Sequence, residues 1–177
     1  MSRIGYLSRP ARGAPAARLV ALLGLVSLLA LVPTAASPYD TRSLTAIVTQ
    51  VVDGDTIHVR VNGRIEKVRY IGMDTPETKH PVRGEEPGGV QATALNRLLV
   101  MGKTVRLELD VRERDRYRRL LAYVYVGDLM VNAELVRLGY AHAMTVPPNV
   151  AHASRFVSLE RQVREACRGL WDRAGGR

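Results

Sequence analysis

The chain has 177 residues, a length that accommodates one domain with short appendages rather than several domains. Its net charge of +9 favours polyanionic partners, because lysine and arginine side chains neutralise phosphates and release their counterions. Cys167 is the only cysteine, which excludes an intrachain disulfide and makes a buried or partly buried structural thiol its expected role.

Residues 1–36 have the pattern of a signal peptide. An arginine-bearing start without acidic residues precedes an apolar run over residues 19–32, which has the length of a signal-peptide core and is short for a membrane span. Small residues follow at the positions that a signal peptidase recognises, so we expect cleavage after Ala36 and a secreted or periplasmic protein. The alternative is an uncleaved leader that tethers the same protein to a membrane.

Residues 37–43 form the expected linker, and the apolar, β-branched residues 44–52 predict a first strand. Residues 56–61 alternate between apolar and polar side chains, Asn62-Gly63 is a strong hairpin signal, and residues 64–72 return as the partner strand. A two-residue turn fixes the register, so Thr56 should face Arg69.

The same register places Asp55 beside Tyr70 and brings Asp74, just beyond the returning strand, near Asp55. A hard divalent cation takes oxygen ligands from carboxylates, backbone carbonyls and water. Asp55 and Asp74 can supply the carboxylates and Thr75 the carbonyl. No histidine or cysteine cluster lies nearby in the sequence, so zinc is a poor candidate.

Three further residues suit the cleavage of a phosphodiester. Glu77 follows Asp74 by three positions, and a carboxylate beside a metal can take a proton from attacking water. Arg69 and Arg119 can each bind two phosphate oxygens with a planar guanidinium. Each motif alone has an ordinary explanation as a turn, a helix cap or a solvated face. The ordered set on one hairpin favours a single site for metal-assisted hydrolysis.

The remaining elements alternate helices with strands and loops. Residues 78–89, rich in proline, glycine and charge, predict a loop beside the site. Helices are expected at 90–101, 131–138 and 151–170, strands at 104–109 and 119–126, a charged loop at 111–118 and a proline-rich connector at 145–149. The last helix carries an apolar stripe that should pack in the core: Phe156, Leu159, Val163 and Ala166, with Trp171 closing the core end. The pattern predicts an α+β barrel.

Four stretches resemble the staphylococcal nuclease (thermonuclease) family: VVDGDTIHV, VRYIGMDTPETKHP, DRYRRLLAYVY and MVNAELVRLGYA. The resemblance covers about residues 45–171. It implies a five-stranded OB-type β-barrel with three helices packed against it, formed by a nuclease domain at 44–172 and followed by a tail at 173–177. It also implies calcium-dependent hydrolysis of DNA and RNA with little sequence preference, leaving 3′-phosphate ends.

The resemblance further implies which side chains act. It assigns Asp55, Asp74 and the Thr75 carbonyl as calcium ligands. Glu77 is the implied general base or water-positioning carboxylate, and Arg69 and Arg119 are the implied phosphate-binding arginines.

The chain departs from the family pattern around the substrate. The family's phosphate-binding arginine lies between two glycines, whereas Arg118 and Leu120 flank Arg119 here. The family's tyrosines after the second helix are replaced by residues 144–148, which contain no aromatic ring. Tyr117 is retained, so we expect Tyr117 and Arg118 to contact substrate.

A non-catalytic OB-type module that binds nucleic acid is the alternative function, since such barrels can bind oligonucleotides without cutting them. Retention of the whole acidic and arginine set argues against it. The sequence implies no stable protein partner, and we expect a monomer.

Overall fold

The computed structural model describes residues 42–78, 84 and 86–172. The predicted leader, most of the predicted linker, part of the loop after Glu77 and the tail 173–177 lie outside these residues. The contacts divide the chain into Met1–Ala36 and Ser37–Arg177, and every described residue belongs to the second unit. Within the described part, no helix combines the length and the apolar character needed to cross a membrane.

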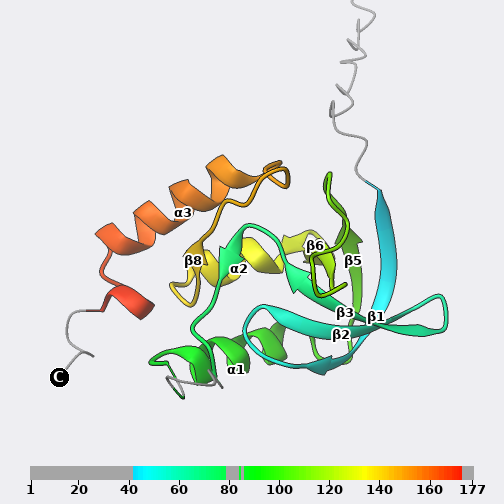
Figure 1. Ribbon diagram of the computed structural model, residues 1–177. Coiled ribbons are helices and arrows are strands. Elements are labelled where there is room, and N and C mark those ends of the chain that lie inside the picture. The colour runs from blue at the N-terminus through cyan, green and yellow to red at the C-terminus, as the bar shows by residue number, and fades with distance from the viewer. Residues whose placement is uncertain (1–41, 79–83, 85, 173–177) are drawn as a thin grey trace, which may run out of the picture. The chain divides into compact units, whose positions relative to one another are not determined.

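Five strands close into a barrel (Figure 1). They are β1 (Ser43–Val51), β2 (Thr56–Val61), β3 (Arg64–Tyr70), β5 (Thr104–Glu108) and β6 (Leu120–Val126). Antiparallel pairing runs in the order β3-β2-β1-β5-β6, and a parallel pairing of β3 with β6 closes the ring. The short β7 (Leu129–Met130) folds back on β6. The predicted α+β barrel with three helices is therefore confirmed.

The β2–β3 hairpin has the predicted register. Asn62 and Gly63 both take positive φ values, 50° and 76°, as a tight two-residue turn between twisted strands requires. Thr56 pairs with Arg69, and the Tyr70 amide donates a hydrogen bond of 2.9 Å to the Asp55 carbonyl. Alternating side chains fill the barrel because successive residues of a strand point to opposite faces. Fully buried examples are Ile57, Val59, Val68, Leu107 and Val124.

Three α-helices complete the domain: α1 (Gly89–Val100), α2 (Val131–Arg137) and α3 (Ala153–Glu165). α2 contacts β6, α1 and α3, and Figure 1 shows it between the other two helices. A two-residue pairing that sequence periodicity did not predict joins β4 (Met73–Asp74) to β8 (His142–Ala143). It ties the segment after the hairpin to the chain between α2 and α3.

The last helix is shorter than predicted. α3 ends at Glu165, and Cys167 then takes a left-handed conformation with φ of 49°, which ends the helix before a 3₁₀ turn, η1, at Gly169–Trp171. Cys167 is exposed, so the expectation of a buried thiol was wrong. Phe156 and Val163 are buried as predicted, whereas Ala166 is exposed. Trp171 is half-buried, and its ring meets the His142 ring edge-on at 5.1 Å.

Candidate active site

Asp55 is held by hydrogen bonds from two directions at the start of β2. Its Oδ1 accepts from the Thr56 hydroxyl at 3.0 Å, and its Oδ2 accepts from both the amide and the hydroxyl of Thr75 at 3.1 Å. The Asp55 amide donates to Asp53 Oδ1 at 3.1 Å, which stabilises the turn before β2. The three hydrogen bonds to its two oxygens give the carboxylate of Asp55 a fixed orientation. The neighbouring Asp53 is also largely enclosed, and this burial raises the pKa of its carboxyl.

The contact between Asp55 and Thr75 depends on Gly54. A Cβ atom at position 54 would lie 2.7 Å from both Cγ2 and Oγ1 of Thr75, closer than any side chain tolerates. The glycine lets the Thr75 side chain close onto the turn, where its two donors reach Asp55. The Asp-Gly-Asp-Thr sequence thus has a packing role in addition to its role in the turn.

Arg69 joins the two predicted metal-binding carboxylates. Its position opposite Thr56 on β3 directs it to the end of the hairpin where Asp55 and Asp74 lie. Its Nη1 forms an ion pair with Asp55 Oδ2, and its Nη2 one of 2.5 Å with Asp74 Oδ1. The Asp55 side chain is 6% exposed and the Asp74 side chain 53%. The structure therefore brings together Asp55, Arg69, Asp74 and Thr75 as predicted.

This donor set suits a hard divalent cation. It combines one fixed, buried carboxylate with one carboxylate open to solvent, and the Thr75 backbone adjoins both. Among the described residues, no three histidine, cysteine, aspartate or glutamate side chains converge as a metal-binding group. Two carboxylates with carbonyl and water oxygens are the donors that calcium accepts, and they are poor donors for zinc.

Glu77 is exposed on the segment that follows β4. Its backbone is anchored by Glu86: the Glu77 amide donates to Glu86 Oε2 at 3.0 Å, and the Glu86 amide donates to the Glu77 carbonyl at 2.8 Å. Within the described part of the chain, no hydrogen bond or ion pair joins the Glu77 carboxylate to Asp55, Arg69 or Asp74. The structure places Glu77 three residues beyond Asp74, with its side chain exposed.

The second predicted phosphate-binding arginine, Arg119, is held in place by Asp115. The sequence predicted Arg119 but assigned no role to Asp115. Arg119 Nε donates to Asp115 Oδ2 at 2.6 Å, and Asp115 Oδ1 accepts the amides of Tyr117 and Arg119, both at 2.9 Å. Burial raises the pKa of the Asp115 carboxyl, but the hydrogen bonds from Arg119 outweigh burial and hold that pKa below its ordinary value. The spacing of four residues between Asp115 and Arg119 was the available sequence signal.

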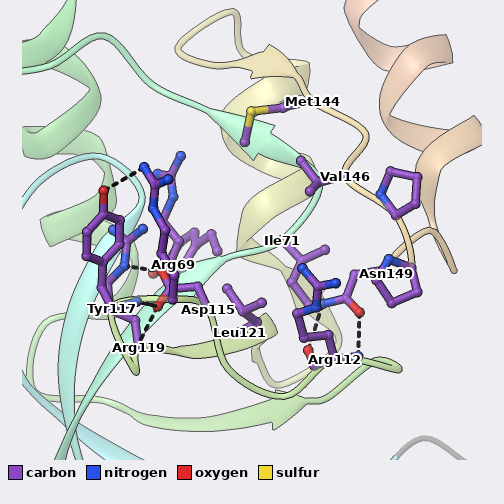
Figure 2. A pocket seen from close by; sticks show the side chains of 15 residues that line it. Arg69, Ile71, Arg112, Asp115, Tyr117, Arg119, Leu121, Met144, Val146 and Asn149 are labelled. Atoms are coloured by element: carbon purple, nitrogen blue, oxygen red, sulfur yellow. Dashed lines mark hydrogen bonds and ion pairs between the residues drawn. The ribbon is translucent and has the colours of Figure 1, made fainter.

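Arg119 and Arg69 both border a pocket of about 340 Å³ (Figure 2). Parallel pairing of β3 with β6 places Arg69 opposite Leu121, two residues from Arg119, which directly precedes β6. Figure 2 shows Arg69, Tyr117 and Arg119 at one end of the pocket and Arg112 and Asn149 at the other.

The other walls of the pocket are apolar. They come from the residue after β3, from β6 and from the connector after β8, and include Ile71, Leu121, Met144, Val146, Pro147 and Pro148. Tyr117 is 64% exposed, and its ring lies under the guanidinium groups of Arg116, at 4.8 Å, and Arg119, at 5.5 Å.

Arg118, predicted to contact substrate, is exposed and does not line this pocket. It takes a left-handed backbone conformation with φ of 64°. Arg116 and Arg112 line the pocket instead. Sequence reasoning missed both, although Arg116 lies in the same motif as Tyr117.

Similarity to known proteins extends over most of this domain. The family model described as Staphylococcal nuclease homologue matches residues 67–173. The chain is 36% identical to the thermonuclease of Staphylococcus intermedius over 141 residues, 80% of this chain and 84% of that protein. It is 38% identical to the thermonuclease of Staphylococcus hyicus over 124 residues, 70% of this chain and 73% of that protein. It is also 38% identical to endonuclease YncB of Bacillus subtilis (strain 168) over 128 residues, 71% of this chain and 61% of that protein.

Proposed function

Since the chain belongs to the family of staphylococcal nuclease homologues, and so is a metal-dependent hydrolytic nuclease, we propose that calcium is its metal. We further propose that it cuts DNA and RNA internally, with little sequence preference, and leaves 3′-phosphate ends. The observation that carries the proposal is the position of Arg69, which contacts the two carboxylates and also borders the pocket that holds Arg119.

The chain's own residues divide the reaction between them. Asp55, Asp74 and the Thr75 carbonyl are the proposed ligands of calcium, which when bound supplies positive charge beside the phosphate. Glu77 orients the attacking water and accepts its proton as the water approaches phosphorus in line with the leaving oxygen. The backbone of Glu77 is anchored to Glu86, which fixes the position from which its exposed side chain extends.

The two arginines neutralise the charge that develops on the phosphate oxygens. Arg119 is pre-oriented by Asp115, which contacts its Nε and so leaves the terminal nitrogens directed at the pocket. Preorganised donors of this kind stabilise a transition state without rearrangement during the reaction. Departure of the 5′ oxygen then leaves the phosphate on the 3′ side.

The remaining pocket holds a nucleotide base without reading its edge. Tyr117 offers an exposed ring, and the apolar wall at Leu121, Met144 and Val146 offers contact to any base. The pocket therefore supports low sequence specificity. We also propose that the protein is exported after cleavage behind Ala36, because the leader has the charge, core length and small residues of a signal peptide.

A plasmid-nicking assay with full-length purified protein tests the proposed cofactor. Calcium should restore nicking after chelation, zinc should not, and Asp55→Asn and Asp74→Asn should remain inactive with either ion. End-labelled oligonucleotide products should carry 3′-phosphates. Cutting that persists in excess chelator, or that zinc restores as well as calcium does, would refute the calcium assignment.

A further inference from the structure

The guanidinium of Arg69 lies where the proposed metal ligands converge. One terminal nitrogen contacts Asp55 Oδ2 and the other contacts Asp74 Oδ1. The Arg69 side chain is 14% exposed and that of Asp55 6%, so their contact is weakly screened, whereas Asp74 is 53% exposed and its contact with Arg69 lies at the edge of the solvent. One side chain thus supplies a positive charge to both carboxylates.

A cation bound by Asp55 and Asp74 would meet this guanidinium at two of their oxygens, Asp55 Oδ2 and Asp74 Oδ1. Asp55 Oδ2 already accepts the amide and the hydroxyl of Thr75 in addition to its contact with Arg69. A divalent cation on that oxygen would also lie within a few ångströms of a fixed positive charge, at a site with little water to screen the repulsion. The contacts that Arg69 now makes with Asp55 and Asp74 are therefore incompatible with a cation bound between the same two carboxylates.

We propose that Arg69 is a tethered cation that occupies the calcium site and must leave it when calcium binds. The inference rests on the calcium site proposed above. Arg69 also lines the neighbouring pocket, so a change of side-chain rotamer carries the released guanidinium from the carboxylates to the phosphate position. Calcium binding then does two things at once: it fills the carboxylate site and it frees a phosphate ligand.

Arg119 provides the contrast within the same pocket. Its partner is Asp115, which touches none of the proposed metal ligands, and its contact through Nε is compatible with a bound phosphate. Arg119 has no need to move between the free and loaded forms. Of the two arginines, only Arg69 couples metal binding to phosphate binding.

The test is calorimetric titration of the full chain with calcium alone, without nucleotide. Arg69→Gln removes the competitor, and Arg119→Gln is the matched control, since it removes an identical charge from the same pocket. If Arg69 blocks the site about nine-tenths of the time, Arg69→Gln should bind calcium roughly tenfold more tightly than the wild type. Arg119→Gln should change the affinity by less than about threefold, the effect of a screened charge at a distance.

A second variant guards against loss of folding. Arg69→Lys keeps the charge but cannot span both carboxylates with one planar group, so its calcium affinity should fall between those of the wild type and Arg69→Gln. Calcium affinity in Arg69→Gln that equals or falls below that of the wild type, in a variant with native circular dichroism, overturns the inference and leaves the calcium site standing. Absence of calcium binding by the wild type and by every variant overturns both.

Discussion

Asp115 and Arg119 form a single rigid unit, with a 2.6 Å contact from Arg119 Nε to one carboxylate oxygen and the Arg119 amide bound to the other at 2.9 Å. The same carboxylate holds the Tyr117 amide. The loop conformation and the arginine orientation therefore depend on one side chain. This explains how the chain positions Arg119 without glycines on either side of it.

Asp115→Asn should lower activity and stability together at neutral pH. The asparagine amide carries no negative charge, so the hydrogen bond that it accepts from the Arg119 guanidinium is weaker. Hydrogen bonds to charged groups contribute about 1.5–3 kcal/mol. We expect kcat/KM to fall by roughly tenfold and the free energy of unfolding to fall by about 1–2 kcal/mol. Urea unfolding and steady-state kinetics measure both, with the exposed Asp128→Asn as a control that changes neither.

Acidification should remove the stability difference between the wild type and Asp115→Asn. The folded-state pKa of Asp115 lies below its ordinary value of 3.8, so the carboxylate's contribution is complete above that value and is lost as the pH falls through the folded-state pKa. Asparagine does not titrate. The two unfolding free energies should therefore begin to converge as the pH falls below about 3.8 and meet below the folded-state pKa, whereas a difference that stays constant as the pH falls from 3.8 to about 2 would contradict the assigned role.

Glu77→Gln should retain the fold and calcium binding but lose most turnover. The substitution keeps the shape and removes the basic carboxylate, and general-base contributions are typically about 10²–10⁴-fold. Single-turnover hydrolysis at saturating enzyme isolates the chemical step. Glu165→Gln, an exposed carboxylate at the end of α3, is the control. Turnover near the wild-type rate, with the calcium requirement intact, would exclude Glu77 as the base.

Gly54→Ala should weaken calcium binding. The added methyl group would meet Thr75 at 2.7 Å and push it from Asp55, so the carboxylate would lose two of its hydrogen bonds. Loss of such supporting contacts typically costs about 10–100-fold in metal affinity. Gly63→Ala is the control: its φ of 76° makes it destabilising, but nothing lies near its Cβ, so calcium affinity should stay unchanged.

Tyr117→Ala should raise the Michaelis constant more than it lowers turnover, because stacking acts on bound substrate and transition state alike. Residues 144–148 supply no ring, so Tyr117 carries most of the stacking, worth about 1–3 kcal/mol per base. For Tyr117→Ala we expect the Michaelis constant to rise roughly tenfold, measured with a single-stranded oligonucleotide at fixed salt. Tyr117→Phe, which keeps the ring and loses only the hydroxyl bound by Arg116, should resemble the wild type. An unchanged constant in Tyr117→Ala would place the nucleotide elsewhere.

The sequence was most informative where local rules determine geometry. The Asn62-Gly63 turn fixes the hairpin register, and that register places Arg69 beside Asp55 and Asp74. Contacts between distant segments were harder to predict from the sequence. The pairing of β4 with β8 spans two residues, too few to show periodicity, and α3 ends where Cys167 takes a left-handed conformation that its residue type does not favour. The role of Asp115 and the placement of Arg116 in the pocket were missed because a charged loop has no repeating pattern.

Closure of the barrel has a consequence for a newly made chain. The hairpin and the segment after it assemble Asp55, Arg69 and Asp74 from neighbouring residues, and this half of the site can form early. Arg119 joins only when β6 docks beside β3 in parallel, a pairing between distant segments that forms slowly because a long loop must close first. The parallel pairing that closes the barrel is thus also the contact that brings the second arginine to the first, so closure of the barrel and completion of the arginine pair are one structural event.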